Sequence, residues 1–237
     1  MANHTFTFRR FTVVQDRCGM KVGTDGVLAG AWAPVPDGAR TLLDIGTGTG
    51  LIALMLAQRF PGTRVDGLDI DHEACLQARE NVSASPWPDR ISVIEDSVQH
   101  FAATTTRRYD AIVTNPPFFV DSLKNPDPRR AAARHADSLP FAQLVRAASV
   151  LLNPGGVFSA IVPDEVLSRF EAEASLAGFF LWRHCRVKTV ERKPPRRHLL
   201  AWTRHRPADF DDREVTLSAP SGERSEWYRS LTSEFYL

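Results

Sequence analysis

The sequence predicts an α/β fold in which a mostly parallel sheet of seven strands is flanked by helices and closed by a C-terminal β-hairpin. Short apolar runs alternate with longer helical patterns, which is typical of parallel strands joined by helical crossovers. The first run, 41–45, ends in a glycine-rich turn that opens into the amphipathic stretch 51–59, and such turns bind ligands at the sheet edge. The predicted strands are 41–45, 63–69, 91–96, 109–114, 157–162, 186–190 and 199–203.

The composition is that of an ordinary globular chain. Its 237 residues are 43% hydrophobic and 24% charged, with a net charge of +1, so no global field points to a polyanionic partner. The three cysteines have no CxxC spacing, which argues against a disulfide framework or a zinc site. Without a signal segment or an apolar stretch of about 20 residues, we expect a cytoplasmic protein that binds no membrane. We interpret 1–237 as one domain with an N-terminal extension (1–40), a core (41–206) and a C-terminal tail (207–237).

The N-terminal extension has two features. Residues 5–14 alternate in polarity like a strand, which predicts a small hairpin or an edge strand. Thr24 and Asp25 both suit the N-cap of the helix that follows them. A capped helix packed on the sheet would explain both residues, and the alternative is that this segment closes over a bound ligand.

Three glycines stand at alternate positions after the first strand: Gly46, Gly48 and Gly50. A turn this tight needs backbone conformations that side chains disfavour, and bare backbone can approach a ligand closely. The spacing is GxGxG and not the GxGxxG of dinucleotide sites, which disfavours an NAD-dependent dehydrogenase. Asp44, just before the turn, suits a ligand with a cationic amine better than one with phosphates.

Two later strands end in acids, Asp69 and Asp96. Ligands in open parallel sheets bind at the carboxyl ends of the strands, so both acids are expected at the binding edge. An acid that ends the second strand can accept both ribose hydroxyls, and we assign Asp69 to this role. Asp71 better suits the N-cap of the next helix. Asp96 is either a ligand contact or a plain helix cap.

The fourth strand, 109–114, runs directly into Asn115-Pro116-Pro117-Phe118. Prolines have no N–H and stop the ladder, which leaves an amide, a carbonyl and a planar ring close together. The tetrapeptide resembles the (N/D)PP(Y/F/W) motif of amino-methylating methyltransferases, and this resemblance implies a target such as the exocyclic amine of adenine. Such an amine is a poor nucleophile because its lone pair is delocalised into the ring. Donation of its N–H groups to the Asn115 oxygen and the Pro116 carbonyl would free that lone pair, while Phe118 stacks on the base. We predict that Asn115, Pro116 and Phe118 are catalytic and that no metal is needed.

Two basic segments follow. The loop 119–140 is long enough to indicate a functional role, and 183–206 carries nine Lys and Arg against one acid. Such a run is usually a solvated face, yet beside the binding edge it favours contact with nucleic-acid phosphates. The tail after 207, with seven acids and three bases, predicts a last antiparallel strand and a docked terminus. The candidate RNA contacts are Arg129, Arg130, Arg134, Arg192, Lys193, Arg196 and Arg197.

With these residues in place, the chain resembles the bacterial tRNA (adenine-N6)-methyltransferases that modify valine tRNA beside its anticodon. The resemblance covers about residues 5–205. The segments that carry it are Phe11-Thr-Val-Val-Gln-Asp, Met20-Lys-Val-Gly-Thr-Asp-Gly-Val-Leu, Gly30-Ala-Trp32, Leu43-Asp-Ile-Gly-Thr-Gly-Thr-Gly, Asn115-Pro-Pro-Phe-Phe and Arg134-His135. Phe118 stands where many relatives have tyrosine, which keeps the stacking face and removes a hydroxyl.

This resemblance implies a Rossmann-like fold, S-adenosylmethionine (SAM) as methyl donor, and adenine 37 in the anticodon loop of valine tRNA as target. It also implies that Asp96 takes the adenine amino group of the cofactor. No obligate protein partner is expected. The residues expected at the cofactor are Thr24, Asp44, Gly46, Gly48, Gly50, Asp69, Asp96 and Asn115.

Three alternatives stay open. Glutamine methyltransferases of release factors share the Asn-Pro-Pro-aromatic motif but usually carry a separate N-terminal helical domain. Guanine-N2 methyltransferases of ribosomal RNA use the same chemistry, and only the family likeness argues against them. An RNA-binding module without activity is disfavoured because the candidate site acids and Asn115 are all present.

Overall fold

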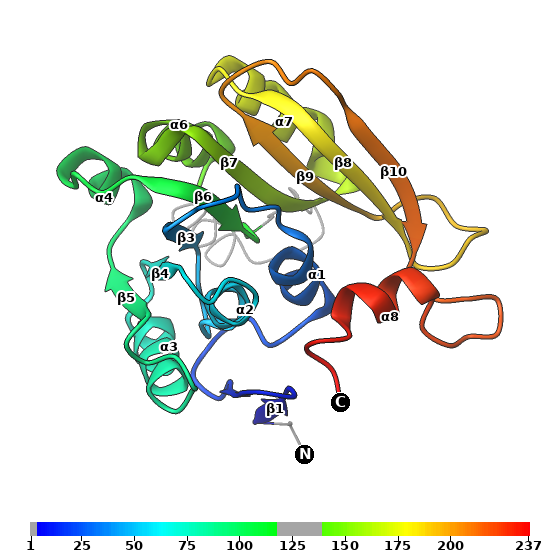
Figure 1. Cartoon of the computed structure of the whole chain (residues 1–237), viewed down its shortest axis with the longest axis horizontal. Coiled ribbons are helices and arrows are strands. Elements are labelled where there is room, and N and C mark those ends of the chain that lie inside the picture. The colour runs from blue at the N-terminus through cyan, green and yellow to red at the C-terminus, as the bar shows by residue number, and fades with distance from the viewer. Residues whose placement is uncertain (1–3, 118–138) are drawn as a thin grey trace, which may run out of the picture.

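A mostly parallel sheet lies at the centre of the molecule (Figure 1). The computed structural model describes residues 4–117 and 139–237. Within the sheet, whose order is β10-β8-β9-β7-β6-β3-β4-β5, β9 runs antiparallel to both of its neighbours. The strands are β3 (Thr41–Ile45), β4 (Arg64–Asp69), β5 (Ile91–Glu95), β6 (Tyr109–Thr114), β7 (Leu152–Pro163), β8 (Phe180–Lys188), β9 (Arg197–Thr203) and β10 (Asp211–Thr216).

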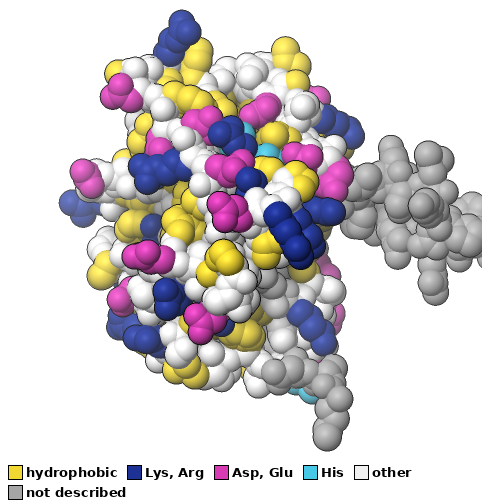
Figure 2. Space-filling view, turned by 90° about the vertical axis from the view of Figure 1, so that its right-hand side faces the viewer, with side chains coloured by type: hydrophobic (Ala, Val, Ile, Leu, Met, Phe, Trp, Pro, Cys, Tyr) yellow, Lys and Arg dark blue, Asp and Glu magenta, His cyan; other side chains and the backbone are white. Residues whose placement is uncertain are grey.

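The described residues form eight strands of this sheet, so the prediction of seven is wrong. The additional strand, β10, comes from the acidic tail and pairs parallel with β8, not antiparallel to the sheet as expected. Opposite charges on neighbouring strands stabilise such pairing. Figure 2 shows that basic and acidic side chains are also interspersed over one whole face of the molecule. Three ion pairs at 2.5 to 3.0 Å join the two strands: Arg183 to Asp211, Arg186 to Asp212 and Lys188 to Glu214.

Helices cover both faces of the sheet, and successive strand residues alternate between the two layers. Leu42 belongs to the hydrophobic cluster that includes α1 and α2, whereas Leu43 belongs to the cluster that includes α4, α6 and α7. Because both faces are covered, the strands read as nearly continuous apolar runs. The helices are α1 (Thr24–Trp32), α2 (Leu51–Arg59), α3 (His72–Ser83), α4 (Val98–Thr104), α6 (Phe141–Leu151), the 3-10 turn η1 (Asp164–Val166), α7 (Leu167–Leu176) and α8 (Glu226–Thr232).

Some element boundaries differ from the predicted ones. β7 begins at Leu152, directly after α6, because Leu152 already pairs with Tyr109 before an irregularity in the register. The hairpin strands begin earlier than expected, at Phe180 and Arg197. Antiparallel pairing of β9 with both β7 and β8 recruits these residues, because long-range pairing extends both strands beyond the runs seen in the sequence.

The helix N-termini test two capping predictions. The Asp71 carboxylate accepts hydrogen bonds from the backbone N–H groups of Glu73 and Ala74, which confirms it as the cap of α3. The prediction of a Thr24 or Asp25 cap is wrong, because α1 begins after Gly23 without a side-chain cap. Asp25 instead forms an ion pair with Arg197, far away in the sequence.

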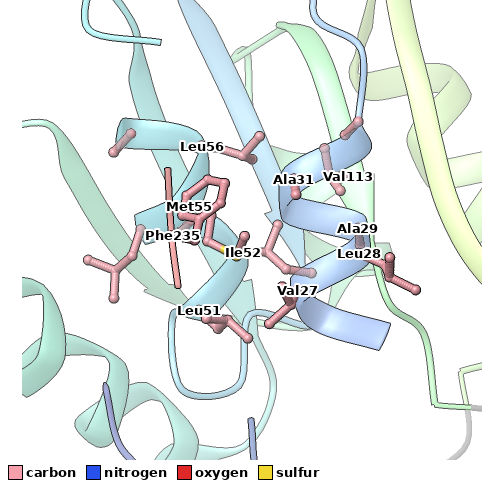
Figure 3. Packing of buried hydrophobic residues seen from close by; sticks show 14 of the residues in the cluster. Val27, Leu28, Ala29, Ala31, Leu51, Ile52, Met55, Leu56, Val113 and Phe235 are labelled. Atoms are coloured by element: carbon pink, nitrogen blue, oxygen red, sulfur yellow. The ribbon is translucent and has the colours of Figure 1, made fainter. Parts of the chain in front are cut away.

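The two ends of the described chain pack together. β1 (Thr5–Thr7) and β2 (Thr12–Val14) form the predicted N-terminal hairpin, and the Arg9 N–H donates to the carbonyl of Phe235 at 2.8 Å. Figure 3 shows Phe235, which is 2% exposed, against α2 beside Met55. The tail is therefore part of the same hydrophobic cluster as α1 and α2. Within the described ranges, no helix is long and apolar enough to cross a membrane.

Candidate functional site

The glycine turn connects β3 to α2 at the carboxyl edge of the sheet. Gly46, Gly48 and Gly50 all have positive φ, of 74°, 55° and 82°, a conformation that side chains disfavour. The N–H of Gly46 donates to the carbonyl of Leu68 at 2.8 Å, and the N–H of Gly48 donates to the Asp69 carboxylate at the same distance. The turn is thus fixed to the end of β4, where the second predicted site residue lies.

Asp44 lies under this turn and is completely buried. Its Oδ2 accepts hydrogen bonds from the Thr47 hydroxyl at 2.6 Å and from the Ala53 N–H at 3.2 Å. Its Oδ1 is buried and has no hydrogen-bond partner among the described residues. Burial is the main reason that the pKa of Asp44 is raised to about 7. A ligand that brings a positively charged donor to this oxygen would therefore be favoured.

Asp69 and Asp96 lie side by side at the ends of β4 and β5, where the Asp96 N–H donates to the Asp69 carbonyl at 2.9 Å. The Asp96 carboxylate accepts from the Ser97 N–H at 2.7 Å and lies 2.8 Å from the His100 ring nitrogen Nδ1. Ser97, not Asp96, caps α4. The cap alternative for Asp96 is therefore wrong, and its contact with the cofactor stays a prediction.

Sequence reasoning missed Ile70, which follows Asp69 directly. Its side chain is 72% exposed, between two acids at the end of β4. A single exposed apolar side chain is common on protein surfaces, and at this edge it could also pack against a flat apolar ligand. The sequence signal for Ile70 was its position, since it directly follows Asp69, the last residue of β4.

Asn115 follows β6 on the same edge of the sheet. Its Oδ1 is buried without a hydrogen-bond partner among the described residues, while its Nδ2 lies 3.7 Å from the sulfur of Met20. A buried acceptor without a donor costs free energy unless a ligand supplies one. Pro116 is buried beside it, and Phe118 lies outside the described residues.

Met20 belongs to the segment 15–23, which runs from the end of β2 to α1. Buried side chains of α3 hold this part of the chain: Asn81 binds both backbone groups of Val14, and Gln77 accepts from the Arg17 N–H. Burial, and next the negative charge of Asp69, raise the pKa of the Cys18 thiol to about 11. Cys18 and Asp69 are therefore close enough to interact electrostatically. The segment therefore spans the edge from Asp69 to Asn115. Thr24, half-buried at its end, keeps its cofactor contact as a prediction.

The predicted RNA contacts divide into three groups. Arg192, Lys193 and Arg196 are exposed in the turn between β8 and β9, and the register of Pro163 with Arg197 places this turn at the carboxyl end of β7. Arg197 is engaged with Asp25. The remaining candidates, Arg129, Arg130 and Arg134, lie outside the described residues.

A buried histidine pair joins β8 and β9 and was not found from the sequence. His184 Nε2 lies 2.8 Å from His198 Nδ1, and His198 Nε2 lies 3.0 Å from the Asp164 carboxylate. Burial lowers the pKa of His184 to about 4 and also lowers the pKa of His198. Both rings are therefore neutral at pH 7, with one nitrogen of the pair donating to the other.

Comparisons with known proteins identify the class of protein. The family described as methyltransferase small domain matches residues 33–180. A predicted O-methyltransferase from Agrobacterium tumefaciens has the same fold, with a TM-score of 0.69 at 17% identity over 89% of this chain and 96% of that one. A methyltransferase from Pyrococcus furiosus gives 0.52 at 18% identity over 72% and 77%. The chain belongs to the methyltransferase small domain family.

Relatives that match the whole chain identify a smaller group within this family. The chain is 48% identical to a Phocaeicola vulgatus protein and 44% identical to a Bacteroides thetaiotaomicron protein, over 100% of its length and 99% of theirs. A Klebsiella pneumoniae protein is 41% identical over 98% of this chain and 94% of its own. All three are named tRNA1(Val) (adenine(37)-N6)-methyltransferase. The resemblance seen in the sequence is confirmed, and the chain is a member of this group.

Proposed function

We propose that this protein transfers a methyl group from SAM to N6 of adenine 37 in the anticodon loop of valine tRNA. The observation that carries the proposal is the buried Oδ1 of Asn115 at the carboxyl edge of the sheet, which has no hydrogen-bond partner in the part of the chain that the structure describes. An oxygen in this state accepts a hydrogen bond from an amine that enters the site. The names of the full-length relatives support the tRNA substrate.

The residues at the edge fit the cofactor. Asp44 offers a cationic amine a buried carboxylate oxygen that is unpartnered within residues 4–117 and 139–237, and the glycine turn offers bare backbone for a close approach. The Asp69 carboxylate keeps free lone pairs for ribose hydroxyls after accepting from Gly48, Asp96 is available for an adenine amino group, and Ile70 can pack against the adenine ring. When bound there, SAM supplies a methyl group on a positively charged sulfur.

The chain's own residues prepare the acceptor nitrogen. Asn115 Oδ1 accepts one N–H of the adenine amine, and the Pro116 carbonyl accepts the other. Both bonds favour a pyramidal nitrogen, whose lone pair then leaves conjugation with the ring and points toward the donor. Met20, near Asn115 Nδ2, favours the amide orientation that presents Oδ1 to the base. The proton that the methylated nitrogen loses goes to water.

The decisive variant is Asn115→Ala. Turnover with valine tRNA should fall by about 100-fold or more, the scale of one preorganised transition-state contact, while SAM affinity in calorimetry stays near wild type. Asn153→Ala, which removes an asparagine bonded to Asp110 at the opposite edge, is the matched control and should keep full turnover. Product RNA digested to nucleosides should contain N6-methyladenosine.

Several outcomes would contradict the proposal. Methylguanosine in ribosomal RNA or methylglutamine in a release factor would place the chain with one of the alternative methyltransferases. Binding of RNA without any methyl transfer would indicate an RNA-binding module. Near-normal turnover of Asn115→Ala would remove the amide from the catalytic group.

We propose that the exposed turn of Arg192, Lys193 and Arg196 contacts the tRNA backbone. Replacing all three by glutamine should raise KM for tRNA and lower the slope of log affinity against log salt by up to about 0.9 for each lost phosphate contact. The control changes Arg146, Arg169 and Arg229, three exposed helix arginines outside the turn. Equal effects in both triple variants would show that the turn has no special role.

A further inference from the structure

A cleft lined by arginines lies at the amino edge of the sheet, opposite to the proposed methyl-transfer site. Its volume is about 330 Å³, within the range of small-ligand pockets, about 300–1,000 Å³. It crosses four neighbouring strands, β6, β3, β4 and β5. Its lining residues lie near the beginning of each of these strands or directly before it. The lining residues are Thr41, Arg64, Asp66, Arg90, Ser92, Arg107, Arg108 and Tyr109.

The cleft exists because the helix on this face is short. α4 has seven residues, about 10 Å of helix, whereas the strands beneath it extend for about 17–20 Å. Its side chains Val98 and Phe101 pack on the sheet near the carboxyl edge with Leu68. The first residues of β4 and β5 are left uncovered, so the floor of the cleft is the sheet itself.

Two of the guanidinium groups are held rigidly. Arg107 lies 2.8 Å from the Asp66 carboxylate, which also accepts from the Tyr109 hydroxyl at 2.7 Å. Arg90 donates to three backbone carbonyls, those of Ala57, Phe60 and Thr63. These contacts fix the positions of both positive charges and leave part of each donor fork available.

The other two guanidinium groups have no acidic partner within the described residues. Arg64 and Arg108 are exposed, and the only carboxylate that lines the cleft, Asp66, is already engaged by Arg107 and Tyr109. Arg10 adds a further positive charge beside Arg90. Like charges this close repel one another, so the arrangement gains from an anion that neutralises it.

We propose that this arginine cleft is a second binding site, which takes a phosphate-bearing ligand. Arginine forks bind phosphate oxygens with two parallel hydrogen bonds, and the hydroxyl group of Ser92, which lines the cleft, can donate to a remaining oxygen. The cleft is larger than a bare phosphate, so the phosphate belongs to a nucleotide-sized group. That group is either a free compound or part of an RNA backbone that continues around the protein from the methyl-transfer edge.

The test uses Arg64→Gln combined with Arg108→Gln. Both side chains are exposed, whereas Asp66, Arg90 and Arg107, which hold the local structure, stay unchanged. The control combines Arg146→Gln with Arg229→Gln, two exposed helix arginines outside the cleft. Inorganic pyrophosphate is titrated into each protein by calorimetry, and valine tRNA affinity is measured across a salt series.

Pyrophosphate should bind the wild type and the control alike and bind the cleft variant at least about tenfold more weakly, since two charged contacts are lost. If the phosphate is that of the RNA backbone, the cleft variant also loses tRNA affinity and salt dependence. If it is that of a free compound, tRNA binding is unchanged. The proposal is overturned if neither probe separates the cleft variant from the control. SAM binding does not enter these readouts, so they stand whether or not the methyl-transfer proposal holds.

Discussion

Asn81 is the best place to test how the carboxyl edge of the sheet is held together. Its side chain is 1% exposed and makes three hydrogen bonds. Its oxygen accepts from the Val14 N–H at 2.8 Å, and its amide donates to the carbonyls of Val14 and Thr49, both at 2.9 Å. One side chain of α3 therefore fastens the N-terminal segment and the glycine turn at once.

Replacing Asn81 by alanine should lower the free energy of unfolding by about 3–5 kcal/mol. Each hydrogen bond contributes about 0.5–1.5 kcal/mol, and a buried backbone group left without a partner costs about 1–3 kcal/mol. For a chain of this length, each kcal/mol changes Tm by about 2–4 °C, so Tm should fall by roughly 6–20 °C. SAM affinity should weaken as well, because Thr49 belongs to the turn.

The measurement is calorimetric or circular-dichroism melting of the wild type, Asn81→Ala and Asn153→Ala. Asn153 makes one side-chain hydrogen bond, at 2.7 Å to Asp110, and its loss should cost about 1 kcal/mol. If Asn81→Ala melts within roughly 2 °C of the wild type, or no lower than Asn153→Ala, the reasoning from these buried contacts is refuted.

Three further predictions concern titration and packing. Asp44, with its pKa raised to about 7 by burial, must be ionised to pair with a cationic amine, so SAM affinity should fall up to about tenfold per pH unit below 7, and Asp44→Asn should remove this dependence. His184, whose pKa is lowered by burial from 6.5 to about 4, takes up its proton more readily when unfolded. Because the raised pKa of Asp44 acts in the opposite direction over the same range, the test uses the Asp44→Asn background, in which urea midpoints should decrease from pH 6.5 toward pH 4, and a flat profile there would contradict the buried pair. Gly30→Ala should cost about 1–3 kcal/mol in urea unfolding, because a Cβ there would lie 2.7 Å from the sulfur of Met55, and Ala31→Gly in the same helix should cost only about 1 kcal/mol.

Much of the cofactor edge could be predicted from the sequence. The glycine turn, the Asp71 cap and the acids at the strand ends depend on residues close together in the chain. Local dihedral preference and the alternation of strands with helices determine such features. Asn115 was found for the same reason, because a strand that runs into two prolines has few ways to continue.

Other features were decided only by the tertiary structure, since they join residues that no local pattern connects. The tail strand adds to the sheet beside β8 because its acids meet three basic side chains there. Asp25 pairs with Arg197 instead of capping α1, and the sulfur of Met20 lies near the amide of Asn115. The arginine cleft assembles from the starts of neighbouring strands, whose side-chain charges come together only when the sheet forms. Contacts between residues far apart in the sequence depend on the order and register of the strands. Each such contact stabilises the protein only after folding has brought both partners together.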